Sequence, residues 1–197
     1  MNVMTDDEVR EFASKNSWSS GIRIDEAGHL FYDELEANCM TLAYPATPLR
    51  VTYYACLASM LGIDADEAQF GGGLLWIRSW NIGSPHLEKS GWKIVEGMRM
   101  GYGELRPLGE ANGHWFRSDE ITDLAAFLVP CFVYGWDAYV VPAGSDCFAF
   151  ISHDGFWCAV TRNVAIHAKL LEDFKDLTPR VDAMKQRFCR PRPLSGG

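Results

Sequence analysis

The sequence has 197 residues, of which 48% are hydrophobic, 13% aromatic and 22% charged, so it can bury a large core and has the length of one globular domain. Its formal net charge of −8 argues against non-specific binding to nucleic-acid phosphates, because such binding needs an excess of lysine and arginine. The longest apolar run, residues 124–136, contains a proline and is too short to cross a bilayer. We therefore expect no nucleic-acid partner and no membrane span.

The six cysteines are scattered and form no C-x-x-C pair. The first residues lack the basic segment and apolar segment of a secretory signal. Scattered cysteines in a chain of this length are typical of buried free thiols rather than of a disulfide framework. These features predict a reduced, cytoplasmic protein. The chain length and the lack of a recognisable linker predict a single domain over residues 1–190, and the Pro/Arg-rich end predicts a flexible tail over residues 191–197.

Capping residues and apolar periodicity predict the first elements. Thr5 followed by Glu8 is a capping box, which predicts a helix that runs to about Asn16. Two β-prone runs around a turn that ends at Gly28 predict a hairpin. Residues 38–44 alternate between two faces, as the side chains of a strand do.

Proline after a capping residue marks the starts of later helices, because proline suits the first helical position. This pattern predicts helices that begin at Thr47–Pro48, Ser84–Pro85 and Thr178–Pro179. Ser118, followed by two acidic residues, predicts another helix, which Pro130 ends or kinks.

Three apolar runs between about residues 136 and 161 predict a three-stranded meander near the C-terminus. Asp154–Gly155, between the last two runs, is typical of a two-residue type I′ turn. Helices and hairpins alternate without the strand–helix–strand rhythm and glycine fingerprint of a dinucleotide-binding fold. We therefore expect an α+β protein, in which an antiparallel sheet packs against several capped helices.

The stretch "ISHDGFWCAVT", residues 151–161, brings a histidine, an aspartate and a cysteine close together in sequence. With a two-residue turn, His153 and Cys158 would lie diagonally on one face, roughly 7 to 8 Å apart between Cα atoms. A nucleophilic thiolate needs an imidazolium or a helix N-terminus beside it, and a third group to hold the base. No such helix precedes Cys158, so the pattern favours a hairpin tip with a thiol in the core.

The remaining catalytic candidates are isolated in the sequence. Cys56 lies on the apolar stripe of a predicted helix, and His114 lies in the short predicted strand 113–116 without an identifiable partner. Together with His153 and Cys158, these residues are candidates for a cysteine-dependent hydrolase. The five histidines are isolated and "FGGGLLW" lacks the G-K-[ST] of a phosphate-binding loop, so we expect neither a metal nor a cofactor.

A tryptophan-rich strand gives the candidate binding surface. In residues 74–82, strict alternation would place Trp76, Arg78 and Trp80 on one face, with the two tryptophans about 13 Å apart. Tryptophan and arginine are enriched at the centres of binding interfaces. The alternative is that another element covers this face and the arginine stem lies along the rings.

The acidic composition, the seven tryptophans and the lack of catalytic motifs favour a non-catalytic module that binds another protein or a small ligand, as an adaptor, a regulator or an immunity-type inhibitor. The alternative, from a different class, is a cysteine-dependent hydrolase with a Cys/His pair. Acidic residues dominate the first 70 positions and basic residues dominate positions 162–192, so these segments could pair within one chain or between the subunits of a homo-oligomer.

Overall fold

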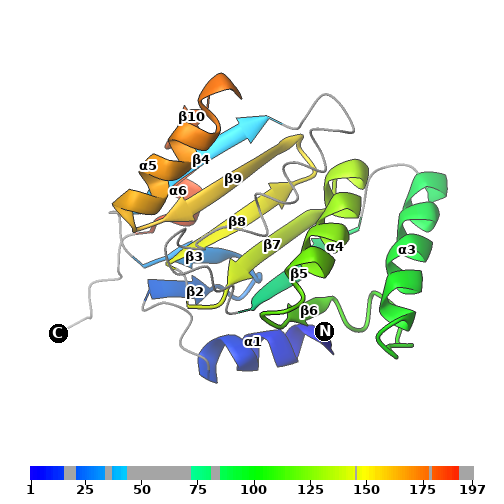
Figure 1. The fold of residues 1–197 in the computed structure, drawn as a ribbon. Coiled ribbons are helices and arrows are strands. Elements are labelled where there is room, and N and C mark those ends of the chain that lie inside the picture. Colours follow the sequence, from blue (N-terminus) through cyan, green and yellow to red (C-terminus); the bar gives the residue numbers. More distant parts are fainter. Residues whose placement is uncertain are drawn as a thin grey trace.

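In the computed structural model, the protein is built around a long antiparallel sheet, and helices lie against both faces of this sheet (Figure 1). The structure describes residues 1–15, 21–33, 37–43, 72–80, 85–144, 146–177 and 179–190. The strands are β1 (Asn2–Met4), β2 (Ile22–Ile24), β3 (Leu30–Tyr32), β4 (Asn38–Ala43), β5 (Gly73–Ser79), β6 (Gly113–Phe116), β7 (Asp137–Pro142), β8 (Cys147–Ser152), β9 (Phe156–Thr161) and β10 (Arg180–Val181). The helices are α1 (Asp6–Lys15), α3 (Pro85–Met100), α4 (Ile121–Tyr134), α5 (Val164–Asp173), the short 3₁₀ helix η2 (Lys175–Leu177) and α6 (Lys185–Phe188).

Eight of these strands form one sheet in the order β1-β6-β5-β7-β8-β9-β4-β10, and every neighbouring pair is antiparallel. β2 and β3 form a separate antiparallel hairpin. β7, β8 and β9 are the predicted C-terminal meander, each strand hydrogen-bonded to the next. The predicted α+β class with an antiparallel sheet is confirmed.

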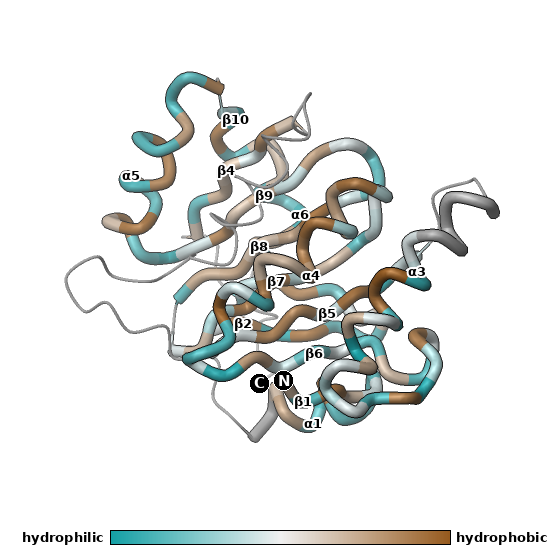
Figure 2. Tube along the Cα trace, turned by 45° about the vertical axis from the view of Figure 1, so that its right-hand side comes forward, coloured by the Kyte–Doolittle hydropathy of each residue, from teal (hydrophilic) through white to brown (hydrophobic). Residues whose placement is uncertain are grey.

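Side chains alternate along the strands and divide the core into two layers. On one side of the sheet, called here the α4 face, side chains of the central strands pack against α3, α4 and α5. On the other side, the α1 face, they pack against α1, the β2–β3 hairpin and α6. Figure 1 shows α4 and α5 in front of the sheet and the hairpin behind it. Figure 2 shows hydrophobic residues along the central strands and a mixture of hydrophobic and hydrophilic residues on α5, as expected for a helix that covers a sheet.

Several local predictions agree with the structure. The amide of Glu8 donates to Thr5 Oγ1 over 3.2 Å and the amide of Thr5 donates to Glu8 Oε2 over 2.7 Å, so the capping box at the start of α1 is formed. Gly28 has a φ of +82° in the turn between β2 and β3. The five described cysteines are buried thiols outside any disulfide; they are Cys39, Cys131, Cys147, Cys158 and Cys189.

The predicted type I′ turn at Asp154–Gly155 is wrong. Ser152 pairs with Phe156, so the loop between β8 and β9 has three residues instead of two. Gly155 has a φ of +82° and Asp154 has no positive φ, whereas a type I′ turn needs a positive φ at both central residues. In this loop the backbone amide of His153 donates to the Asp137 carboxylate over 2.9 Å instead of pairing with β9.

Helix boundaries also differ from the predictions. α4 begins at Ile121, not near Ser118, because residues 117–120 form a separate turn that the amide of Glu120 closes by donating to the carbonyl of Arg117. The helix continues through Pro130 to Tyr134, and Gly135, whose φ is +63°, caps its C-terminal end.

The C-terminal region departs further from the predictions. The segment predicted as a last helix from Thr178–Pro179 instead contains β10, whose backbone pairs with β4, and α6 begins only at Lys185. α5 was not predicted; its start is capped by Asn163, whose side chain accepts the amides of Ala165 and Ile166. Thr178 itself, Cys56 and the helix predicted from Thr47–Pro48 lie outside the described residues.

Within the described ranges, no helix combines the length and apolar character needed to cross a membrane.

Candidate functional site

The three residues of the predicted binding surface do not share a face. Ile77 pairs with Ala138 and Ser79 pairs with Asp137, so Arg78 is an extra residue in β5 and forms a β-bulge. The bulge reverses the alternation beyond it. Trp76 is fully buried on the α1 face, whereas Trp80 packs on the α4 face, with its ring centroid 4.8 Å from that of Trp136. Strict alternation was therefore the wrong basis for grouping Trp80 with the other two, and a binding role for the three residues remains a prediction.

Asp6 collects three hydrogen-bond donors at the start of α1. Its Oδ1 atom accepts from Trp76 Nε1 and from Asn112 Nδ2, each over 2.9 Å, and its Oδ2 atom accepts from Arg78 Nη1. Burial by itself would raise the pKa of Asp6, but the hydrogen bonds from Arg78, Asn112 and Trp76 outweigh it and hold this pKa below its ordinary value. Asp6 is thus an ionised anchor between α1, β5 and the loop before β6.

Arg78 is held in one orientation. Its guanidinium carbon lies 4.4 Å from the centroid of the Trp76 ring, and its Nη2 atom donates to the carbonyl of Ala27 over 2.9 Å. Gly28 makes room for it, since a Cβ atom there would lie 2.4 Å from Arg78 Nη2. Arg10 of α1 donates to the carbonyls of Asp25 and Glu26 in the same turn. Two arginines therefore fix the turn of the β2–β3 hairpin against α1 and β5.

A cavity of about 490 Å³, called here the acidic groove, opens beside this anchor. Its lining residues come from the start of α1, the bulge of β5 and the loop before β6; they are Thr5, Asp6, Asp7, Arg78, Gly109, Glu110 and Asn112. Asp7 and Glu110 are exposed, and among the described residues no hydrogen bond or ion pair engages their carboxylates. Asn112 Oδ1 is buried and accepts no hydrogen bond. Because Asp6 already pairs with Arg78, the groove presents acceptors and net negative charge.

Cys158 lacks the environment of a nucleophile. Its side chain is fully buried on the α1 face, and burial first, then the neighbouring Cys39 thiol, raises the pKa of Cys158 well above its ordinary value. A thiol is a poor nucleophile while it stays protonated. His153 is exposed in the β8–β9 loop, and its Nδ1 atom lies 2.9 Å from Asp137 Oδ1. The structure thus pairs His153 with Asp137.

His114 cannot assist Cys158. Its ring lies on the α4 face, 5.3 Å from the ring of Phe127, whereas Cys158 lies on the opposite face. Three strands separate β6 from β9, which corresponds to about 19 Å. Burial first, and then the charge of Arg99, lower the pKa of His114 to about 3. The described cysteine and histidine candidates therefore do not assemble into a catalytic pair.

The groove contains residues that sequence reasoning missed. Asp6 lies between the two capping-box residues, and its type did not distinguish it from other acidic residues that favour a helix N-terminus. Asn112 precedes β6 without any motif, and its contact with Asp6 spans 106 positions of the chain. Among the described residues, no cluster of three or more histidine, cysteine or acidic side chains could hold a metal ion.

Family models, curated proteins and solved structures give no match to this chain. The case for a function therefore depends on the residues of the acidic groove and their contacts.

Proposed function

We propose that this protein is a non-catalytic binding module, an adaptor or inhibitor, which receives a lysine or arginine side chain of a partner protein in the acidic groove. The observation that carries the proposal is the pair of exposed carboxylates, Asp7 and Glu110, which line the same cavity as the preorganised cluster of Asp6, Arg78 and Asn112. The net charge of −8 would attract a basic partner over a longer range.

The chemistry of the groove suits a cation. An incoming ammonium or guanidinium would meet the exposed carboxylates of Asp7 and Glu110, and hydrogen bonds between charged groups are shorter and stronger than neutral ones. Because Trp76, Asn112 and Arg78 already hold the Asp6 carboxylate, this cluster would need little reordering on binding.

The lining residues supply no activated nucleophile, which supports binding rather than catalysis. Thr5 carries the single hydroxyl among them, and its Oγ1 atom accepts the amide of Glu8 in the capping box. The Asp6 carboxylate uses both oxygens on donors, so it is not available as a general base.

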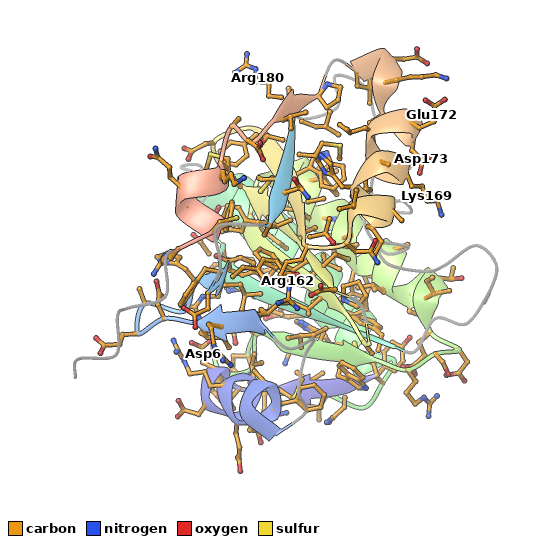
Figure 3. The ribbon with its side chains drawn as sticks, turned by 90° about the vertical axis from the view of Figure 1, so that its left-hand side faces the viewer. Asp6, Arg162, Lys169, Glu172, Asp173 and Arg180 are labelled. Carbon is orange, nitrogen blue, oxygen red and sulfur yellow. The ribbon has the colours of Figure 1, made fainter. Side chains whose placement is uncertain are left out.

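The test is calorimetric titration with a hexa-arginine peptide at low salt. Asp7→Asn combined with Glu110→Gln should weaken binding about 10-fold, as expected for two solvent-facing ion pairs. The matched control is Asp173→Asn with Asp176→Asn, which changes the net charge by the same amount. Asp173 lies on α5, at the opposite end of the molecule from Asp6 (Figure 3).

The control separates the groove from general attraction to an acidic protein. If both double variants weaken binding equally, the peptide recognises net charge and the proposal is wrong. Failure of the wild-type protein to bind the peptide at low salt would also reject it.

A further inference from the structure

Arg99, in the last turn of α3, is a buried cation without hydrogen bonds. Its side chain is 1% exposed, and its Nε, Nη1 and Nη2 atoms all lack a hydrogen-bond partner. Burying a guanidinium is costly unless hydrogen bonds and an opposite charge compensate it. The Arg99 guanidinium is therefore expected either to have an unusual structural role or to bind a ligand.

Glu104 is the nearest carboxylate, and it is already engaged. Its Oε1 atom lies 3.9 Å from Arg99 Nη2, beyond hydrogen-bond distance. Both of its oxygens instead accept from Arg106: Nε lies 3.0 and 3.1 Å from them, and Nη2 lies 2.6 Å from Oε2. These bonds lower the pKa of Glu104 to about 2. Most of the Glu104 charge is therefore matched by Arg106, and Arg99 remains undercompensated.

Arg99 also lines a cavity of about 250 Å³, which shares no residue with the acidic groove. Met100, Leu105 and Pro107 give this cavity apolar walls, and the Glu104–Arg106 ion pair, which also lines it, adds no net charge. Glu96 also lines the cavity as an opposing charge, but its side chain is exposed to water, which screens it.

We propose that this cavity is a binding site for a small oxyanion, a carboxylate or phosphate group of a metabolite-sized ligand. The planar guanidinium of Arg99 offers paired donors, which match two oxygens of such a group. The volume is below that of most sites for drug-sized ligands, so the anion is small. This inference goes beyond the proposed function and does not depend on it.

The test compares thermal unfolding and calorimetric binding with sodium phosphate and with sodium acetate, against sodium chloride at matched ionic strength. The wild-type melting temperature should rise saturably with one of the two anions. Arg99→Met should weaken that binding about 10-fold or more, since hydrogen bonds to charged groups contribute strongly. Arg180→Met, on the exposed far edge of the sheet (Figure 3), should leave it unchanged.

Three results would overturn the proposal. The wild-type protein could respond to neither anion beyond the chloride control, or Arg99→Met could bind the anion as well as the wild type does. The third is a large loss of stability of Arg99→Met in the absence of any anion. The last result would assign Arg99 a structural role, because replacing a buried charge that makes no hydrogen bond by an apolar chain should otherwise leave the fold as stable or more stable. Arg99→Lys keeps the charge without the paired donors, and its binding should be intermediate. A response to phosphate alone or to acetate alone identifies the class of anion.

Discussion

At the scale of single residues, two histidines respond to their surroundings in opposite directions. His114 is buried against Phe127, and burial is the largest cause of its low pKa. His153 is half exposed, and its hydrogen bond with Asp137 is the largest cause of its raised pKa. The two residues should therefore contribute to the pH dependence of stability with opposite signs.

His114 should make the protein less stable in acid. Its folded-state pKa of about 3 lies below the ordinary 6.5, so its contribution is complete above pH 6.5 and declines as the pH falls toward 3. Between pH 7 and pH 4.5 the wild type should lose about 2 to 3 kcal/mol more unfolding free energy than His114→Phe does. Urea titrations at several pH values would measure this, and parallel pH profiles for the two proteins would contradict it.

His153 should show the reverse behaviour. Because its folded-state pKa is raised, the stability from the Asp137 contact is complete below pH 6.5 and is lost as the pH rises through the raised value. NMR titration of the ring should give a pKa above 6.5, and Asp137→Asn should return it toward the ordinary value. An unchanged pKa in that variant would mean that Asp137 is not the cause.

At the scale of elements, the β8–β9 loop depends on the backbone of Gly155. A Cβ atom at this position would contact nothing within 4 Å, so the cost of a substitution comes from the positive φ alone. Gly155→Val should lower the unfolding free energy by about 1 to 3 kcal/mol, whereas Gly155→Asn should cost less because asparagine tolerates this conformation. Equal urea midpoints for the two variants would contradict the assigned loop geometry.

Two glycines of α3 test how this helix packs. A Cβ atom at Gly91 would lie 2.7 Å from Trp136 and 2.8 Å from Tyr134, whereas one at Gly97 would meet nothing within 4 Å. Alanine favours a helix interior over glycine by about 1 kcal/mol. Gly97→Ala should therefore stabilise the protein and Gly91→Ala should destabilise it, because the stacked rings of Trp136 and Tyr134 cannot move apart freely. Thermal melting of both variants would show whether α3 approaches these rings so closely.

At the scale of the whole molecule, the sheet joins distant parts of the chain. β1 pairs with β6, and β10, near the other end of the chain, pairs with β4. The Met1 ammonium also forms an ion pair with Glu120. The predicted single domain over residues 1–190 should therefore unfold in one cooperative step. Tryptophan fluorescence and far-UV circular dichroism should give coincident urea transitions, and two separated transitions would indicate independent domains.

Much of the local structure could be predicted from the sequence, because the interactions that define it join neighbouring residues. The Thr5–Glu8 capping box spans three positions, and the hairpin around Gly28 and the meander from β7 to β9 join segments that follow one another in the chain. Strand alternation and residue type predicted a binding surface of Trp76, Arg78 and Trp80, and their binding role stays a prediction. The start of α4 was predicted less accurately, because a separate turn, closed by the bond from the Glu120 amide to the Arg117 carbonyl, precedes the helix.

By itself, then, the sequence determined the fold class, the order of most elements and the buried thiol state of the described cysteines. The tertiary structure alone decided that Trp80 turns to the α4 face, because the bulge at Arg78 arises from the register with β7. It also decided that Asp6 meets Trp76 and Asn112, which lie 70 and 106 positions away, and that Arg99 is buried beside a carboxylate already engaged by Arg106. Such sites depend on strand register and on long-range packing, and neither property is encoded in the spacing of neighbouring residues.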